Sequence, residues 1–105
     1  MAVPIINVSI LNGSNGFRLD GAKGSSSFGR SVSTAGDVNG DGFDDVIIGS
    51  SDTSYVVFGK ASGFDATLGL SSLDGSNGFR LDGAGHSVSG AEDVNGEGFD
   101  DLCIV

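Results

Sequence analysis

Short apolar runs alternate along the chain with polar turns that are rich in glycine. The clearest runs are residues 44–49 (DDVIIG) and 54–59 (SYVVFG), which contain the β-branched and aromatic residues that strands favour. Ser50–Thr53 connects them with the length of a hairpin turn. Three further runs have the small or alternating side chains expected of strands: residues 31–35, 17–20 and 79–82.

No segment shows helical periodicity over ten or more residues, so the pattern predicts an all-β chain. Counting a second strand pair that ends at residues 101–105, the runs predict at most seven strands. Residues 4–10 leave room for one more extended piece. The small side chains of residues 31–35 suit a crowded position, such as the inner strand of a radial array.

An internal repeat organises the sequence. Residues 11–22 recur at 73–84 with one substitution, and residues 29–48 recur at 85–104. The second copy lacks the equivalent of residues 23–28. The repeat is therefore about sixty residues long, and the chain holds fewer than two copies.

The length of 105 residues fits one small domain or part of a larger one. We interpret residues 1–105 as a single unit, with one repeat copy at 11–72 and a truncated copy at 73–105. A repeat unit cannot bury its apolar faces alone. The apolar run 101–105 is therefore expected to leave an open strand edge, through which the chain self-associates.

The most informative segment is the acidic loop at residues 37–45 (DVNGDGFDD). Calcium takes six to eight hard oxygen ligands, and a short loop supplies them by turning alternate side chains inward. A plain Asp/Asn/Gly turn is the alternative interpretation, but the spacing recurs at residues 93–101. The predicted ligands are the side chains of Asp37, Asn39, Asp41 and Asp45 and the carbonyl oxygen of Phe43.

The loop is not an EF-hand. An EF-hand needs a bidentate acid at its twelfth position, on a helix. Here the twelfth positions are Ile48 and Ile104, and a β run follows each loop. A dockerin-type loop, which also ends on a helix, is excluded for the same reason. The closing acid of the first loop is therefore Asp45, at the start of a strand.

The second loop carries Glu97 at the position of Asp41. The extra methylene group must fit into the same turn, so we expect this loop to bind calcium more weakly. Asp44 and Asp100 stand at even positions and point away from the predicted cage. We interpret them as solvated or turn-capping carboxylates.

Charge and composition exclude several classes. Fourteen acidic against five scattered basic residues give a net charge of −9, whereas a nucleic-acid partner requires a basic stripe. No apolar stretch approaches the roughly 18 residues of a membrane span, and the N-terminus lacks the basic region of a signal peptide. Cys103 is the only cysteine, so no internal disulfide is possible. Its apolar neighbours predict a buried, small hydrophobic residue.

Two segments, residues 28–32 (FGRSV) and 35–49 (AGDVNGDGFDDVIIG), resemble the FG-GAP repeat of integrin α subunits and bacterial integrin-like proteins. Residues 54–59 and 73–80 are most similar to the bacterial branch. The resemblance implies β-propeller blades of four antiparallel strands, seven in a complete propeller. It also implies one calcium ion in the loop that joins the first two strands of a blade.

Carried over by position, the resemblance implies a second ligand set: Asp93, Asn95, Glu97, Asp101 and the Phe99 carbonyl oxygen. Two departures from the family pattern concern packing. Gly49 is not followed by the usual proline-bearing end of the motif, and the second copy lacks the Phe-Gly pair. The chain then represents one complete blade plus partial blades.

The implied role is an extracellular or cell-surface adhesion scaffold with protein or glycan partners. The rival class is an enzyme, because some propellers carry active sites. No nucleophile–base pair is visible, since Cys103 is expected to be buried and His86 has no obvious partner. We therefore predict a non-enzymatic chain. The alternative is the non-catalytic propeller portion of a larger secreted enzyme, such as a hydrolase.

Overall fold

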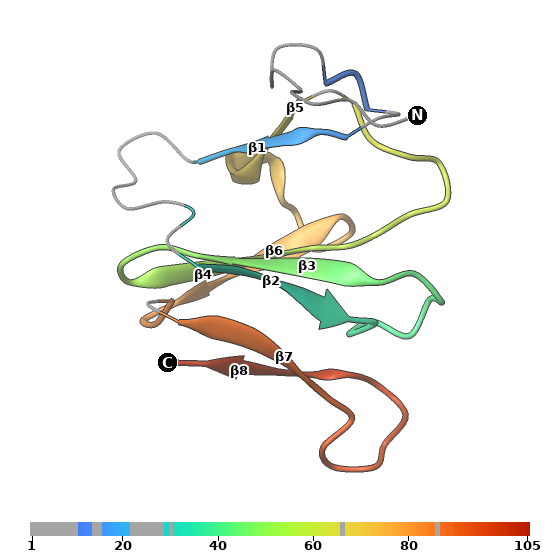
Figure 1. Cartoon of the computed structure of the whole chain (residues 1–105), viewed down its shortest axis with the longest axis vertical. Helices are drawn as coiled ribbons and strands as arrows, with labels where there is room; N and C mark the ends of the chain where they lie inside the picture. Colours follow the sequence, from blue (N-terminus) through green and yellow to red (C-terminus); the bar gives the residue numbers. More distant parts are fainter. Residues whose placement is uncertain (1–10, 14–15, 22–28, 30, 66, 86) are drawn as a thin grey trace, which may run out of the picture.

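The computed structural model describes residues 11–13, 16–21, 29, 31–65, 67–85 and 87–105. Its elements stack in three layers, with β1 and β5 on one side of a central sheet and β7 and β8 on the other (Figure 1). Within these residues, no helix is long and apolar enough to cross a membrane. The elements are β1 (Arg18–Asp20), β2 (Ser31–Gly36), β3 (Asp45–Gly49), β4 (Thr53–Val57), β5 (Thr67–Gly69), the 3-10 helix η2 (Leu70–Ser72), β6 (Gly78–Asp82), β7 (Val88–Glu92) and β8 (Asp101–Ile104).

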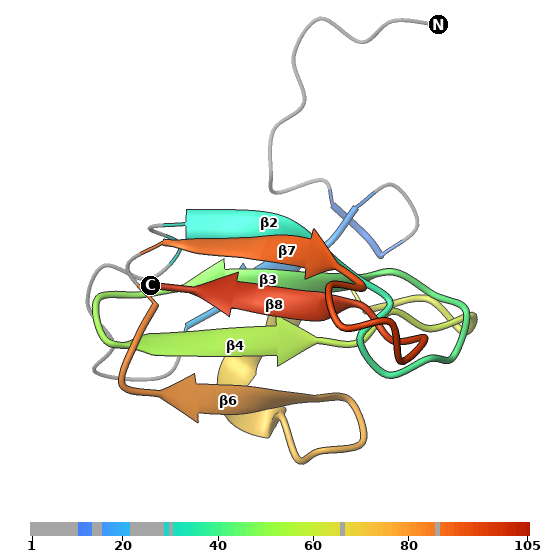
Figure 2. The same cartoon turned by 90° about the horizontal axis from the view of Figure 1, so that it is seen from below.

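The central layer is a four-stranded antiparallel sheet in the order β2-β3-β4-β6 (Figure 2). Three of its strands follow one another along the chain, and β5 and η2 lie between them and the fourth strand, β6, in the sequence. The sheet confirms the predicted all-β class and has the strand number and order of a propeller blade. Its outer strand, β6, belongs to the second repeat copy, so the blade crosses the boundary between the two copies.

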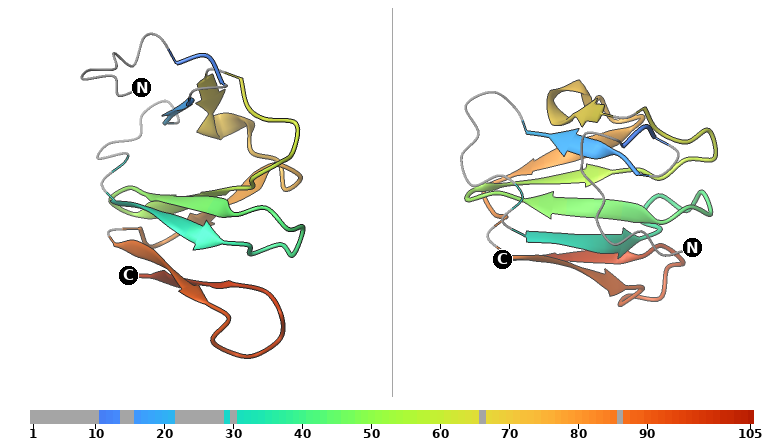
Figure 3. Two further views of the ribbon diagram at one scale, coloured as in Figure 1. Left: turned by 45° about the vertical axis from the view of Figure 1, so that its right-hand side comes forward. Right: turned by 45° about the horizontal axis from the view of Figure 1, so that its top comes forward.

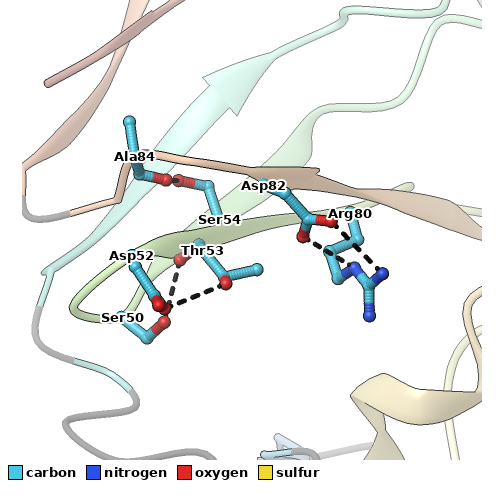
Figure 4. A network of polar contacts seen from close by, with 7 residues as sticks. All are labelled: Ser50, Asp52, Thr53, Ser54, Arg80, Asp82 and Ala84. Carbon is cyan, nitrogen blue, oxygen red and sulfur yellow. Dashed lines mark hydrogen bonds and ion pairs between the residues drawn. The ribbon is translucent and has the colours of Figure 1, made fainter.

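The predicted hairpin between β3 and β4 is confirmed (Figure 4). The Ser50 backbone N–H donates to the Thr53 carbonyl oxygen at 2.8 Å, and the Ser50 hydroxyl donates to the same oxygen at 3.0 Å. The buried hydroxyl of Ser54 donates to the Ala84 carbonyl oxygen at 2.7 Å, just beyond β6. These bonds tie the turn to the chain that leaves the outer strand.

Alternate side chains of the blade point to opposite faces, and each face has its own core. The face toward β7 and β8 is centred on four buried residues, Ala35, Ile47, Val56 and Val88. The face toward β1 and β5 is centred on Ile48, Tyr55, Val57 and Leu70. Ala35 is fully buried on β2, whereas Val32 on the same strand is 63% exposed, so only part of the strand is as crowded as the small side chains predicted.

Strands β7 and β8 repeat the first half of the blade. They pair antiparallel, and a register shift between Gly90 and Glu92 matches the shift between Thr34 and Gly36 in β2. Figure 3 shows from two further sides that this pair packs beneath the blade, with β7 beside β2. The pair is therefore the start of a second blade.

The prediction of at most seven strands is wrong, because the described residues contain eight. The unpredicted strand is β5, which pairs in parallel with β1 over three residues. So short a segment has no recognisable pattern of its own, and its pairing depends on a partner far away in the sequence. The rings of Phe17 and Phe64 stack beside it, with centroids 4.2 Å apart. The extended piece predicted at 4–10 lies outside the described residues.

The expectation that Cys103 is buried is also wrong, because its side chain is exposed. Its repeat equivalent is Ile47, which is fully buried between the blade and the β7–β8 pair. In the described part of the chain, no further layer lies on the other face of β8. Cys103 and Val105 therefore remain exposed, whereas Leu102 and Ile104 pack against the core.

Candidate metal-binding loops

Two acidic loops connect equivalent strands in the two repeat copies. Residues 37–44 join β2 to β3, and residues 93–100 join β7 to β8. Both loops project from the same end of the stacked layers, as the views in Figures 1 and 2 agree. This is where the family resemblance places calcium.

The first loop is wound around the carboxylate of Asp37. This carboxylate accepts backbone N–H groups from Gly40 at 2.8 Å, Asp41 at 3.1 Å and Gly42 at 2.8 Å. The Asp41 carboxylate in turn accepts the N–H of Phe43 at 3.0 Å. Gly40 and Gly42 have φ values of +77° and +90°, which residues other than glycine rarely adopt. The glycines therefore allow the tight turn that the spacing predicted.

Asp45 ties this loop to the blade. It is the first residue of β3, and only 1% of its surface is exposed. Its carboxylate accepts the N–H of Val38 at 2.9 Å and the N–H of Gly59 at 2.8 Å. It thus joins the start of the loop to the residues that follow β4. The importance of Gly59 was not predicted, because nothing in the local sequence links it to the loop.

The pKa values of Asp45 and Asp37 are shifted in opposite directions. Burial raises the pKa of Asp45. The hydrogen bonds from the N–H groups of Gly59 and Val38 lower it in part, and the charges of Asp41 and Asp37 raise it. The N–H of Gly42, followed by those of Gly40 and Asp41, lowers the pKa of Asp37. The charges of Asp41 and Asp37 are smaller causes of the shift at Asp45 than burial, and a cation in the loop would act in the opposite direction.

The described residues contain no ready-made cage of three or more acidic, histidine or cysteine side chains. The carboxylates instead bind loop N–H groups, and the Asn39 amide donates to Asp41 at 3.3 Å. Each carboxylate oxygen has two lone pairs, so these bonds leave acceptor capacity. All the atoms that could bind a metal are hard oxygens in one short loop. The donor set therefore fits calcium chemically.

The second loop repeats this winding with nearly the same bond lengths. The Asp93 carboxylate accepts the N–H groups of Gly96 at 2.8 Å, Glu97 at 3.2 Å and Gly98 at 2.9 Å. Asp101 accepts the N–H of Val94 at 2.9 Å and is half-buried. Of the bonds in the described structure, none gives Asp101 a second backbone donor like Gly59. The predicted ligand residues of this loop include the exposed Asn95, Glu97 and Phe99.

Asp100 has a role that the sequence did not reveal. Its carboxylate accepts the N–H of Asp37 in the other loop at 2.9 Å. It therefore caps a turn in the neighbouring repeat copy instead of its own. Its repeat equivalent, Asp44, is exposed, as expected of a solvated carboxylate. An acid just before each closing residue was the only sequence signal for this contact.

Relatives of this chain carry the same kind of repeat. Residues 28–63 match the FG-GAP repeat family. Integrin alpha pat-2 of Caenorhabditis elegans is 34% identical over 86 residues, which cover 73% of this chain and 7% of that protein. No solved structure matches the chain significantly. The four-stranded blade, the loop between its first two strands and these matches agree: the chain belongs to the FG-GAP repeat family, and its repeat is of the integrin alpha type.

Proposed function

We propose that this chain is a calcium-binding, integrin-like β-propeller repeat that serves as an extracellular or cell-surface scaffold for adhesion or recognition. The observation that carries the proposal is the first acidic loop. Its carboxylates lie within one short, tightly wound loop, and its closing acid, Asp45, is anchored by two backbone N–H groups at the end of the blade. The similarity to an integrin alpha subunit supports the adhesion role.

Calcium, when bound, would supply positive charge that offsets the repulsion among these carboxylates. It would thereby stabilise the loop on the strands that it joins. Up to two ions are proposed, one for each loop. The ion in the first loop would be held by Asp37, Asn39, Asp41, Asp45 and the Phe43 carbonyl oxygen. The ion in the second loop would be held by Asp93, Asn95, Glu97, Asp101 and the Phe99 carbonyl oxygen.

The scaffold role is favoured over a catalytic one. The exposed thiol of Cys103 lies on β8, and no general base is seen beside it in the described structure. His86, the other candidate, lies outside the described residues. The blade faces are packed with apolar side chains, which suits a structural repeat. The alternative remains that the chain is a non-catalytic propeller portion of a larger secreted enzyme.

Calcium is expected to raise the melting temperature of the chain, and EDTA to reverse the rise. At a calcium concentration 100 times the dissociation constant, linkage gives about 2.7 kcal/mol of added stability. The measurements are calorimetric calcium titration and thermal denaturation followed by circular dichroism. The double variant Asp37→Ala/Asp93→Ala should lose the calcium effect.

The matched control for that variant is Asp74→Asn. Asp74 also caps a tight turn, accepting the N–H of Ser76 at 3.0 Å, but it belongs to neither acidic loop. This control should keep the full calcium response. A melting curve that calcium leaves unchanged in the wild-type chain would contradict the proposed function.

Self-association is expected through the exposed apolar residues of the second blade. Val105, just beyond β8, is 73% exposed, and Cys103 is exposed on β8. An uncovered apolar strand pairs readily with another chain. Light scattering at micromolar concentration should show oligomers, and Val105→Lys should shift them toward the monomer. A compact wild-type monomer across the whole concentration range would refute this expectation. Protein or glycan ligands are the other proposed partners.

A further inference from the structure

We propose that Asp100 is a positioning residue through which the second acidic loop holds the first and couples calcium binding at the two. This inference rests on the proposed calcium function and deepens it. The bond runs between residues 63 positions apart, from the Asp37 N–H to the Asp100 carboxylate. It links the residue before the closing ligand of one loop to the first ligand of the other.

The contact is a two-bond bridge. The Asp100 carboxylate accepts the Asp37 N–H at 2.9 Å, and the Asp100 N–H donates to the Asp37 carbonyl oxygen at 3.1 Å. Both backbone groups of Asp37 are therefore held by one residue. A two-point contact fixes orientation as well as distance, so the position of Asp37 follows that of Asp100.

Gly36 shows how closely this bridge approaches the first blade. Its φ is +70°, and a Cβ there would overlap the Asp100 carboxylate. The repeat equivalent of Gly36 is Glu92, which has nearly the same conformation, with φ of 59°. The backbone conformation alone therefore does not require glycine. A side chain at Gly36 would instead have to displace the Asp100 carboxylate from its bridging position.

A second matched pair gives the same result one turn further along. Gly40 and Gly96 are repeat equivalents with φ values of +77° and +74°. A Cβ on Gly40 would overlap the Phe99 ring, whereas a Cβ on Gly96 would meet nothing within 4 Å. Phe99 and Asp100 thus approach the first loop at Gly40 and Gly36, whereas a Cβ on Gly42 of the same loop would meet nothing within 4 Å. In the described structure, no side chain approaches Gly96 or Gly98 of the second loop in this way.

This asymmetry has a consequence for binding. Calcium at the second loop would order Phe99 and Asp100, which lie within it, and so pre-organise Asp37 for the first ion. Because coupling free energies are reciprocal, calcium at the first loop would strengthen binding at the second by the same factor.

The bridge is tested first without metal, by amide hydrogen exchange of the Asp37 N–H in EDTA. Asp100→Ala should accelerate this exchange on the order of tenfold, because the N–H loses its acceptor. Asp100→Asn keeps an acceptor oxygen and should restore most of the protection. Asp44→Ala, the repeat-matched control, should leave the rate unchanged. Equal rates in wild type and Asp100→Ala would overturn the bridge.

The coupling is tested by a double-mutant cycle of calcium affinities, measured on the full chain. The affinity of the first loop is measured by calorimetry in wild type and in Asp93→Ala, and again with Asp100→Asn and Asp100→Ala in each background. We expect Asp93→Ala to weaken the first loop about fivefold or more when Asp100 is present, and not when it is alanine. Asp100→Asn should retain part of the coupling, because asparagine keeps an acceptor oxygen for the Asp37 N–H. If Asp100 only stabilised the fold, this partial retention would not be expected.

The outcomes separate the two proposals. Calcium binding at both loops, with the first loop indifferent to Asp93→Ala, would overturn the coupling and leave the proposed function standing. A coupling that persists in Asp100→Ala would overturn the role of Asp100. Absence of calcium binding at either loop would overturn the proposed function and the coupling, whereas the exchange experiment would still report on the bridge itself.

Discussion

Asp45→Ala is expected to lower the free energy of unfolding of the calcium-free chain by about 3 kcal/mol. Asp45 is 1% exposed, and its carboxylate accepts two N–H groups, from Val38 and Gly59. Alanine removes both acceptors at once. Each partly buried N–H left without a partner costs about 1–3 kcal/mol, and the void adds to the loss.

For a domain of this size, such a loss lowers the melting temperature by roughly 10–20 °C. The measurement is thermal and urea denaturation in EDTA, so that no ligand role of Asp45 contributes. Asp101→Ala is the matched control, because this repeat equivalent is half-buried and accepts one backbone N–H, from Val94. Its effect should be less than half as large. Equal losses in the two variants would show that the anchor at Gly59 contributes nothing.

Gly49→Val is expected to destabilise the chain by a similar amount, about 3 kcal/mol. Gly49 is the buried last residue of β3, and a Cβ there would overlap the carbonyl oxygen of Gly85. A Val88 methyl carbon would lie 3.1 Å from the same Cβ. Backbone atoms cannot rotate away as a flexible side chain can. The substitution therefore forces the β7–β8 pair away from the blade.

The repeat itself provides the control for this substitution. The equivalent of Gly49 in the second copy is Val105, which is 73% exposed. Val105→Gly should change stability by no more than about 0.5 kcal/mol, as is usual for exposed positions. Denaturation curves of both variants decide the matter. If Gly49→Val folds with wild-type stability, the close approach of β3 to Gly85 is not a tight contact.

Local patterns predicted much of the fold. The run 44–49 and the connection Ser50–Thr53 became β3 and its hairpin, and the predicted inner, outer and second-copy strands also formed. These elements depend on β-branched runs and glycine turns, which are readable from neighbouring residues. β5 was missed because three residues carry too little pattern, and its pairing with β1 is long-range.

The candidate site divides in the same way. The winding of the loop around Asp37 follows from Asp, Asn and Gly at fixed offsets, so the sequence pointed to it. The anchor from Gly59 to Asp45 and the bridge from Asp100 to Asp37 join residues far apart in the chain. No local spacing predicts either contact.

The sequence by itself determined the all-β class, the positions of most strands and the two acidic loops, because each depends on residues close together in the chain. Only the tertiary structure decided how equivalent residues of the repeat differ. Ile47 is buried while Cys103 is exposed, and Asp100 bridges two loops while Asp44 is exposed. The physical reason is that burial and hydrogen bonding depend on what packs against a residue, and the two repeat copies have different neighbours.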